Sequence, residues 1–248
     1  MLASDQKLPV AGGAEKRAYV RETFAAIAPT YDRLNRIMTL RLDLRWRRKA
    51  VARLEWQRAP QGIYLDLCAG TLDFAAALAR APGFRGRVVG ADFVRSMLER
   101  GRDKAPRLTP VVADALELPF PDAAFDGGMV GWGVRNLADL DAGLREAARV
   151  LKPGARLVVL DTATPAWQPM RAAYRLYFER VLPLVGRWVS KHRTAYRWLP
   201  ESTRSFPGPG ELARRIRAAG FAEVGYSLFA GGVTALHVGV RHPSAHGA

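Results

Sequence analysis

The stretch Leu65-Asp66-Leu67-Cys68-Ala69-Gly70-Thr71-Leu72-Asp73 decides the fold of this chain. It joins the end of a short aliphatic run, Gly62 to Leu67, to the start of a helical pattern, Asp73 to Arg80. A buried strand that leads directly into a helix is typical of the strand-helix-strand units that build parallel sheets. We therefore expect an α/β fold.

The same alternation continues on the carboxyl side of this stretch. The five predicted parallel strands are Gly62–Leu67, Arg87–Asp92, Leu108–Asp114, Phe125–Val130 and Arg156–Asp161. The predicted helices between them are Asp73–Arg80, Ser96–Lys104 and Asp139–Leu151, and Lys152-Pro153-Gly154 is expected to end the last one. A mainly parallel sheet with helices between its strands follows from this order.

The remaining segments predict more helices and a final pair of strands. Residues 165–199 read as a helical region interrupted by Pro169 and Pro183, followed by a helix over Glu211–Ala219. The runs Phe221–Leu228 and Val233–Val240, joined at Gly231-Gly232, predict an antiparallel strand pair at one side of the sheet. The basic region before residue 60 also reads as helical.

Length and composition favour one domain with an extension. The 248 residues are 49% hydrophobic and 25% charged, which excludes general disorder. Cys68 is the single cysteine, so neither a disulfide scaffold nor a cysteine-rich metal site is expected, and we predict no metal. We expect residues 1–60 to form a leader and basic helical extension and 61–248 the main domain, with 166–210 as a helical insertion that covers the substrate.

No segment predicts a signal peptide or a membrane span. The first twenty residues mix charged and small residues without an apolar run of seven, so they read as a loose leader. Residues 224–240 carry no formal charge, but four glycines and a Gly-Gly pair favour two strands over a helix in lipid.

The net charge of +15 belongs to the two flanks of the chain. Residues 61–165 hold 13 basic and 13 acidic residues, whereas 1–60 hold 13 and 6 and 166–248 hold 12 and 4. The basic residues of the flanks alternate with Leu, Ile, Trp, Tyr and Phe, a composition suited to an anionic membrane surface. Single-stranded RNA would accept the same composition, and solvated faces of arginine-rich helices are a third interpretation.

Polar residues at the predicted strand ends indicate a nucleoside site. Gly70 would let the backbone approach a ligand, and Thr71 offers a hydroxyl and an amide at the start of a helix. Asp92, 22 residues beyond Gly70, is suited to the two hydroxyls of a ribose. Asp114-Ala115 could receive the amino group of an adenine, with Phe93 or Met97 covering the ring.

The same residues favour S-adenosylmethionine over a dinucleotide. The Gly-x-Gly-x-x-Gly spacing is absent, so a pyrophosphate would find few free amides. Asp66 would instead suit the ammonium of an amino-acid tail. The alternative is that Asp92 and Asp114 only cap the following helices.

Several longer motifs make a family resemblance visible between about Val20 and Val240. The motifs are Val-Arg-Glu-Thr-Phe-Ala-Ala-Ile-Ala-Pro-Thr-Tyr-Asp-Arg-Leu-Asn (20–35), Leu-Pro-Phe-Pro-Asp-Ala-Ala-Phe-Asp (118–126), Gly-Val-Arg-Asn (133–136), Arg-Val-Leu-Lys-Pro-Gly (149–154), Tyr-Arg-Trp-Leu-Pro-Glu-Ser (196–202) and Gly-Gly-Val-Thr-Ala-Leu-His-Val-Gly (231–239). With them the chain resembles the quinone-biosynthesis C-methyltransferases that act on demethylmenaquinone or its ubiquinone-pathway counterpart.

The resemblance implies a class I S-adenosylmethionine-dependent methyltransferase with a Rossmann-like fold. Thr71, Asp92, Asp114 and Ala115 would take the positions of the family's cofactor-binding residues. The substrate would be a polyprenyl quinol, most simply demethylmenaquinol, reached from the inner face of the cell membrane by a peripherally bound cytoplasmic enzyme. No nucleic-acid partner is expected, and a homodimer is compatible with the resemblance.

Three positions depart from the family pattern. Leu72 stands where members usually have glycine, Gly131 where they often have serine, and Asp161 where glutamate is common. Leu72 would either crowd the methionine end of the cofactor or point into the core. Loss of one hydroxyl at Gly131 would weaken binding by about 0.5 to 1.5 kcal/mol.

Methyl transfer to a ring carbon requires an ionised or nearly ionised neighbouring hydroxyl. Arg135 is the candidate to stabilise that phenolate, and we expect a water held by Arg135 and Asn136 to take the proton. His237 reads as a hydrogen-bonded structural histidine. Tyr31 and Tyr196 could contact the quinol or serve as core aromatics.

Two other functions remain open from the sequence. The first is a methyltransferase for another small molecule or for RNA, which only the basic composition favours. The second is a non-catalytic binding module in which Leu72 has closed the cofactor pocket. Ser190-Lys191 and residues 201–208 favour the menaquinone side of the resemblance over the ubiquinone side.

Overall fold

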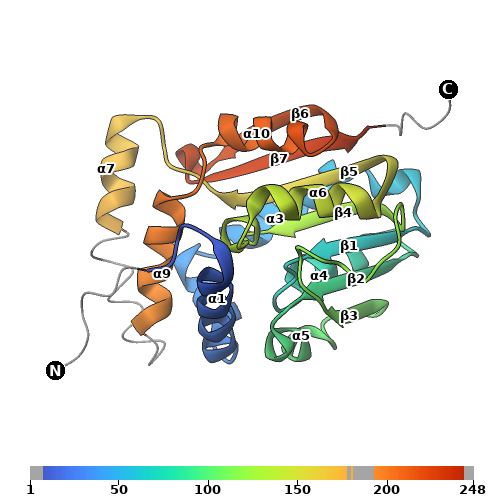
Figure 1. Cartoon of the computed structure of the whole chain (residues 1–248), viewed down its shortest axis with the longest axis horizontal. Helices are drawn as coiled ribbons and strands as arrows, with labels where there is room; N and C mark the ends of the chain where they lie inside the picture. The colour runs from blue at the N-terminus through green and yellow to red at the C-terminus, as the bar shows by residue number, and fades with distance from the viewer. Residues whose placement is uncertain (1–7, 178–179, 181–192, 243–248) are drawn as a thin grey trace.

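One seven-stranded sheet organises the molecule (Figure 1), of which the computed structural model describes residues 8–177, 180 and 193–242. The strand order is β3-β2-β1-β4-β5-β7-β6. The strands are β1 (Ile63–Leu67), β2 (Arg87–Asp92), β3 (Leu108–Val112), β4 (Phe125–Gly131), β5 (Leu151–Thr162), β6 (Phe221–Phe229) and β7 (Thr234–Arg241). Strands β1 to β5 run parallel, and β7 is antiparallel to both β5 and β6. The predicted mainly parallel sheet with a C-terminal antiparallel pair is confirmed.

The helices follow the predicted alternation, with three of them before the sheet begins. They are α1 (Gly13–Ile27), α2 (Tyr31–Met38), α3 (Leu42–Arg53), α4 (Asp73–Ala79), α5 (Arg95–Gly101), α6 (Leu140–Val150), α7 (Gln168–Leu176), α9 (Arg193–Arg204) and α10 (Pro209–Ala218), with 3-10 turns at η1 (Trp56–Arg58), η2 (Val134–Asn136) and η4 (Ala230–Gly232). Within the described ranges, no helix combines the length and apolarity needed to cross a bilayer.

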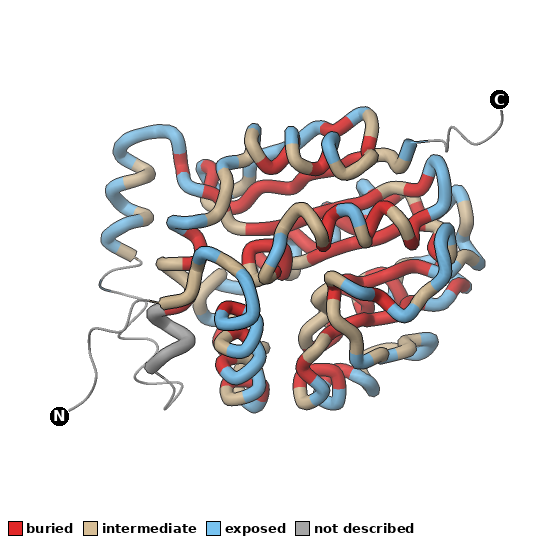
Figure 2. Tube along the Cα trace, in the orientation of Figure 1, coloured by how far each residue is buried: buried red, intermediate tan, exposed pale blue. Residues whose placement is uncertain are grey.

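The core fills both faces of the sheet because each face is covered by helices. One apolar cluster joins α6 and α10 to one face, and a second joins α3 and α4 to the other. Figure 2 shows the central strands as mostly buried. Trp46, Ala50 and Val51 of α3 belong to the second cluster, so part of the expected N-terminal extension is built into the core of the sheet.

Two predicted boundaries are wrong. Helix α6 ends at Val150 and β5 begins at Leu151, so Lys152-Pro153-Gly154 lie within the strand beside a register shift against β4. Helix α9 continues through Pro200 to Arg204 instead of ending at Leu199. Pro183 lies outside the described residues.

The edge of the sheet where ligands bind is set by this topology. Strand β1 lies between β2 and β4, and the chain moves outward from β1 in both directions. Open α/β sheets bind ligands beyond the carboxyl ends of the strands at such a reversal of strand order. The residues after β1, β2, β3, β4 and β5 therefore meet at one place.

Candidate functional site

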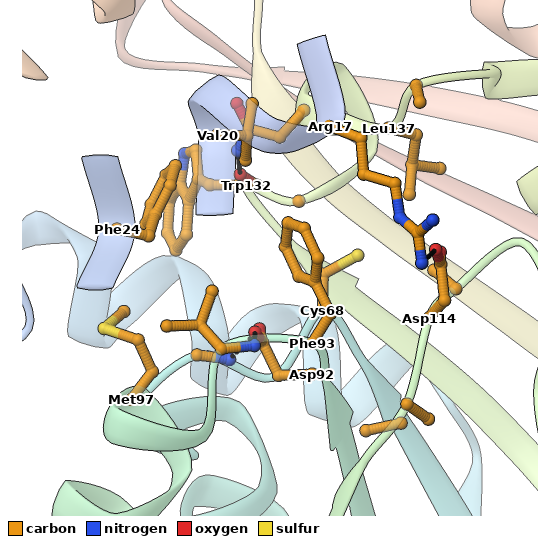
Figure 3. Close-up of a pocket in the computed structure, with 18 of the residues that line it drawn as sticks. Arg17, Val20, Phe24, Cys68, Asp92, Phe93, Met97, Asp114, Trp132 and Leu137 are labelled. Carbon is orange, nitrogen blue, oxygen red and sulfur yellow. Dashed lines mark hydrogen bonds and ion pairs between the residues drawn. The ribbon is translucent and has the colours of Figure 1, made fainter. Parts of the chain in front are cut away.

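A cavity lies at these strand ends, and we call it the strand-end cavity. Its wall comprises Arg17, Val20, Phe24, Tyr31, Cys68, Gly70, Ala91, Asp92, Phe93, Val94, Met97, Ala113, Asp114, Ala115, Gly131, Trp132, Gly133, Asn136, Leu137 and Ala138. The structure thus brings together Gly70, Asp92, Phe93, Asp114 and Ala115, five of the seven expected cofactor-binding residues. Figure 3 shows this cavity from close by.

Asp92 is fixed at the end of β2 by two backbone amides. Its Oδ2 accepts a hydrogen bond from the Gly70 amide and its Oδ1 one from the Val94 amide, each at 2.8 Å. Burial raises the pKa of Asp92 to about 6, although both hydrogen bonds act in the opposite direction. Each oxygen keeps a second lone pair, so the carboxylate can still accept hydroxyl groups from a ligand.

Gly70 gives the turn after β1 its shape. Its φ of 52° lies in the left-handed region, which glycine adopts without steric cost. A Cβ at this position would lie 3.4 Å from Cε of Met97 and 3.9 Å from Cε1 of Tyr31. The absence of a side chain therefore leaves the backbone accessible between these two residues.

Helix α1 closes over the strand-end cavity. Its Arg17 pairs with Oδ2 of Asp114 at 2.6 Å, and Figure 3 shows this side chain reaching across from α1. Val20 and Phe24 of the same helix also line the wall. The cavity has a volume of about 60 Å³, well below the roughly 300 Å³ of a typical small-molecule pocket. A nucleoside therefore needs more space than this cavity offers, and Arg17, Val20 and Phe24 of α1 are among the side chains that narrow it.

Asp66 and Thr71 are not on the cavity wall, contrary to the sequence prediction. Asp66 is 1% exposed and accepts a hydrogen bond from the Ala75 amide at 2.8 Å, which fixes the start of α4. Burial raises the pKa of Asp66 to about 7. The Thr71 hydroxyl donates to Asp32 of α2 instead of facing the cavity.

Leu72 does not crowd the cavity. It adopts a φ of 60° before α4, is fully buried, and belongs to the core cluster beneath the sheet. A Cβ on Gly90 would lie 2.1 Å from Cδ2 of Leu72, so Gly90 provides the space for this leucine.

At Gly131, a Cβ would lie 2.9 Å from Cδ1 of Phe74, whose ring occupies the position of the expected serine side chain.

A second cavity, which we call the apolar cavity, adjoins the first and has a volume of about 400 Å³. Its wall comprises Thr23, Phe24, Ile27, Tyr31, Leu34, Asn35, Met38, Thr39, Leu40, Leu42, Asp43, Trp46, Arg47, Trp132, Arg135, Thr162, Met170, Ala173, Tyr174, Tyr177, Trp198, Leu199, Ala230, Val233 and Thr234. Phe24, Tyr31 and Trp132 line both cavities, so the two spaces meet at these three aromatic residues.

Arg135 provides a buried positive charge on the wall of the apolar cavity. Its Nη1 donates to Oδ1 of Asp161 and to the Trp132 carbonyl, both at 2.7 Å. The side chain is only 7% exposed, and its Nε has no hydrogen-bond partner. The shorter Asp161 in place of glutamate therefore still reaches the guanidinium.

Asn136 faces a different space from its neighbour. It lines the strand-end cavity, whereas Arg135 lines the apolar one. Its amide nitrogen donates to the Trp132 carbonyl at 3.2 Å, and its amide oxygen accepts from Nε1 of Trp198 at 2.9 Å. Arg135 donates to the same Trp132 carbonyl, so the two side chains meet at this oxygen, and the water expected between them stays a prediction.

The other singled-out residues divide between wall and core. Tyr31 lies on the shared wall, and burial raises the pKa of its hydroxyl, which therefore stays protonated at neutral pH. His237 is buried with Nε2 2.9 Å from the Pro209 carbonyl, in agreement with a structural role, and burial lowers the pKa of its ring. The side chain of Tyr196 lies outside what the structure describes.

Parts of the second basic flank cannot be placed. Phe178, Arg187, Trp188 and Lys191, together with the Ser190-Lys191 motif, lie outside the described residues, as do the side chains of 193–197.

Sequence reasoning missed Arg17, Phe24 and Trp132 as site residues. Arg17 and Phe24 lie in α1, far before β1 in the sequence, and only the packing of α1 brings them to the strand ends. Trp132 directly follows β4, so its position at a strand end was the available signal.

Comparison with known proteins agrees with this geometry. Residues 13–241 match the profile of the ubiE/COQ5 methyltransferase family. The chain is 49% identical to a demethylmenaquinone methyltransferase of Thermus thermophilus, over 88% of this chain and 99% of that protein. It is 39% identical to one of Desulfitobacterium hafniense, over 94% of each chain.

Solved structures show the same fold at low identity. A SAM-dependent methyltransferase from Thermotoga maritima aligns with a TM-score of 0.64 and 20% identity, over 90% of this chain and 99% of that one. A putative methyltransferase of Haloferax volcanii, solved with the activator Trm112, aligns with a TM-score of 0.64 and 19% identity, over 89% and 98%. The fold is that of the class I S-adenosylmethionine-dependent methyltransferases.

Proposed function

The chain belongs to the ubiE/COQ5 methyltransferase family, and from this premise we propose that it transfers the methyl group of S-adenosylmethionine to a ring carbon of demethylmenaquinol. The product is menaquinol. The curated relatives that match at 37 to 49% identity are named demethylmenaquinone methyltransferases, which favours this naphthoquinol over the ubiquinone-pathway benzoquinol.

The observation that carries the proposal is the contact between the two cavities. The strand-end cavity has the carboxylates suited to a nucleoside, and the apolar cavity has the size and lining suited to a prenylated ring. They meet at Phe24, Tyr31 and Trp132. A donor and an acceptor bound on the two sides would therefore approach each other at these rings, and holding both in line supplies much of the acceleration.

The residues of the strand-end cavity fit S-adenosylmethionine. Asp92 would accept the ribose hydroxyls, Asp114 and Ala115 would hold the adenine edge, and Phe93 would cover the ring over the Gly70 turn. When bound, this cofactor supplies an electrophilic methyl group. Asp114 must lose its ion pair with Arg17 before it can bind the adenine. The free-energy cost is small, because ion pairs near the surface contribute about 0 to 1 kcal/mol.

Arg135 supports the chemistry on the acceptor side. The hydroxyl beside the reacting carbon must lose its proton, and a fixed guanidinium in an apolar cavity strongly favours the resulting anion. Asp161 and the Trp132 carbonyl hold the guanidinium in place before the substrate arrives. We assign Asn136 a positioning role, since it ties the Trp132 loop to Trp198 of α9.

The helices around the apolar cavity would cover the prenylated ring. Met170, Ala173 and Tyr177 of the 166–210 segment line that cavity, which supports the role expected for this insertion. Large apolar residues that are exposed in this region include Leu40 on the cavity wall, by 82%, Leu176 on α7, by 53%, and Trp167 directly before α7, by 67%. Such a rim favours peripheral binding at a membrane, where the quinol is dissolved.

The test is methyl transfer with a labelled donor to three acceptors: a short-chain demethylmenaquinol, the corresponding ubiquinone-pathway benzoquinol, and bulk RNA. We expect label in the naphthoquinol, with less in the benzoquinol and none in RNA. Label in RNA alone would support the alternative methyltransferase. A donor affinity weaker than millimolar, with no transfer, would support the non-catalytic alternative.

A further inference from the structure

We propose that Arg47 binds the second oxygen of the quinol, the hydroxyl on the opposite side of the ring from the one that Arg135 stabilises. This inference rests on the proposed function and makes Arg47 a substrate-binding residue. It also specifies the substrate class: a 1,4-dihydroxy aromatic ring, held at both oxygens.

Arg47 is a buried residue that borders the space where the substrate ring would bind. It lies on α3 and lines the apolar cavity, and its side chain is only 7% exposed. Its Nη1 donates to Oδ2 of Asp43 at 2.8 Å, and its guanidinium lies 4.7 Å from the ring centre of Trp132. Its Nη1 also lies 3.6 Å from Oδ2 of Asp73, so the charge is held between two carboxylates and an aromatic face.

Arg47 also has an unsatisfied hydrogen-bond donor, its Nε. Among the residues that the structure describes, Arg47, Arg135 and Arg156 have a buried Nε without a partner. Arg156 lines neither cavity, and its side chain is 19% exposed, against 7% for each of the other two. A buried donor without a partner costs about 1 to 3 kcal/mol, and a bound acceptor recovers that loss. Two of these three donors therefore belong to arginines that line the apolar cavity.

Trp132 connects the two arginines. Its carbonyl accepts the hydrogen bond from Arg135, and its ring lies under Arg47. Tyr31 also lies within the electrostatic reach of both: burial raises the pKa of Tyr31, and the charges of Arg135 and Arg47 oppose that rise. The two guanidinium groups thus border one space, at the place where the apolar cavity meets the strand-end cavity.

A hydroquinone matches this arrangement chemically. Its two oxygens stand on opposite sides of one ring, and each accepts a hydrogen bond in the plane of the ring. Contact at one oxygen alone would leave the ring able to turn, whereas contact at both fixes which ring carbon faces the donor. Arg135 would serve the hydroxyl beside the reacting carbon, and Arg47 the hydroxyl beside the prenyl chain.

The experiment compares two acceptors in the intact enzyme. One is a short-chain demethylmenaquinol, and the other is the 3-prenyl-1-naphthol that lacks the hydroxyl beside the prenyl chain but keeps the one beside the reacting carbon. The measured quantity is the ratio of their kcat/KM values. Because the missing hydroxyl also alters the reactivity of the ring, the decisive comparison is this ratio in wild type against this ratio in Arg47→Met.

In wild type we expect kcat/KM to be higher for demethylmenaquinol than for 3-prenyl-1-naphthol. In Arg47→Met we expect the ratio of the two values to fall by about 10- to 100-fold. Arg36→Met is the matched control, because Arg36 bonds the same Asp43 carboxylate but does not line the apolar cavity. The control should retain the wild-type ratio even if its stability falls. Donor affinity, measured by equilibrium binding, should stay within a few-fold of wild type in both variants.

An unchanged ratio in Arg47→Met, or an equal loss in Arg36→Met, would overturn the proposal and leave Arg47 a structural residue. If Arg47→Met does not fold, Arg47→Lys serves the same comparison, since it keeps a charge beside Asp43 but lacks the Nε–H. Its ratio must also fall, and retention of the wild-type ratio would overturn the proposal. If wild type methylates neither demethylmenaquinol nor 3-prenyl-1-naphthol, the proposed function itself is refuted.

Discussion

At the scale of single residues, the site depends on charges that the fold has removed from water. Asp92 and Arg135 are both more than nine-tenths buried, and each is held by backbone groups at a strand end. Burial makes such charges effective toward a ligand, because the surrounding dielectric is low and little reorganisation is needed.

The charge of Arg135 is expected to matter for turnover more than for donor binding. Arg135→Ala should lower kcat by about 10²- to 10³-fold, since it removes a preorganised charge from the developing anion. Donor affinity should change little, because Arg135 does not line the strand-end cavity. Steady-state kinetics and equilibrium binding check this, with Arg156→Ala as a control. Turnover within a few-fold of wild type would contradict the phenolate argument.

Asp92 should make donor affinity depend on pH. Its pKa of about 6 lies above the ordinary value, so the carboxylate that accepts the ribose hydroxyls is lost as pH falls through 6. Affinity should therefore weaken by up to about tenfold per pH unit below that value and level off above pH 7. The contribution of Asp92 to the free energy of unfolding has the opposite trend and falls as pH rises from about 4 to 6.

Calorimetric binding of the donor between pH 5 and 8 measures this dependence. Asp92→Asn should bind more weakly and with a flat profile. Asp66→Asn is the control, because Asp66 is a buried carboxyl with a raised pKa that does not line the cavity. A flat profile in wild type would show that Asp92 does not hold the ribose.

At the scale of elements, α1 and the turn between β1 and α4 shape the strand-end cavity. Helix α1 packs against α5 and α9, and Figure 1 shows it between these two helices. Its residues narrow the cavity, whereas the turn after β1 directs Leu72 away from it. Neither effect is visible in local sequence patterns.

Arg17 should compete with the donor for Asp114. Arg17→Ala is expected to strengthen donor binding by up to about fivefold, the equivalent of one exposed ion pair. Arg21→Ala, on an exposed position of the same helix that does not line the cavity, should have no effect. Equilibrium binding at low salt measures both variants. Weaker binding in Arg17→Ala would instead mean that Arg17 contacts the donor.

Leu72 and Gly90 should behave as one packing unit. Leu72→Ala should destabilise the protein by about 2 to 5 kcal/mol through a cavity, and Gly90→Ala by about 1 to 3 kcal/mol through overpacking. The double variant should cost less than the sum of the two, since the added methyl group occupies space that the leucine has vacated. Urea unfolding of the three variants measures the coupling. Full additivity, or a large loss of donor affinity in Leu72→Ala, would contradict this placement.

At the scale of the whole molecule, exposed basic and apolar side chains occur on the helices that line the apolar cavity and next to them. The apolar cavity opens among α2, α3 and α7. Exposed basic residues on or beside these helices include Arg33, Arg41, Arg45, Arg48, Lys49 and Arg175. Basic charge around exposed Leu and Trp side chains is suited to an anionic bilayer.

Vesicle binding should therefore depend on both charge and apolar contact. We expect sedimentation with phosphatidylglycerol vesicles at low salt, loss of binding as salt rises, and little binding to phosphatidylcholine. Leu40→Ser combined with Trp167→Ala should weaken binding by about tenfold or more, because both side chains would leave the interface. Ile63→Ser, an exposed position at the amino end of β1 and so away from the carboxyl ends of the strands, is the control. Equal sedimentation with both lipids would contradict the proposal.

The sequence by itself determined the α/β fold, the mainly parallel sheet with its C-terminal antiparallel pair, and five residues of the strand-end cavity. Short-range alternation of apolar residues sets strands and helices, and parallel strands bring their carboxyl ends to one edge, so Asp92 and Asp114 had to lie near each other. Leu72 could not be placed in this way, because its side-chain direction depends on the space that Gly90 leaves in the neighbouring strand.

Only the tertiary structure decided which side chains share a cavity. Asp66 was expected beside a ligand, but it lies off the cavity wall and accepts from the Ala75 amide. Asn136 does line the strand-end cavity, where it donates to the Trp132 carbonyl and accepts from Trp198. Arg47 read as one arginine among many in a basic flank, yet the packing of α3 on the sheet buries it beside Trp132. Such contacts join residues far apart in the chain, and their geometry follows from how helices pack on the sheet, which local sequence patterns do not encode.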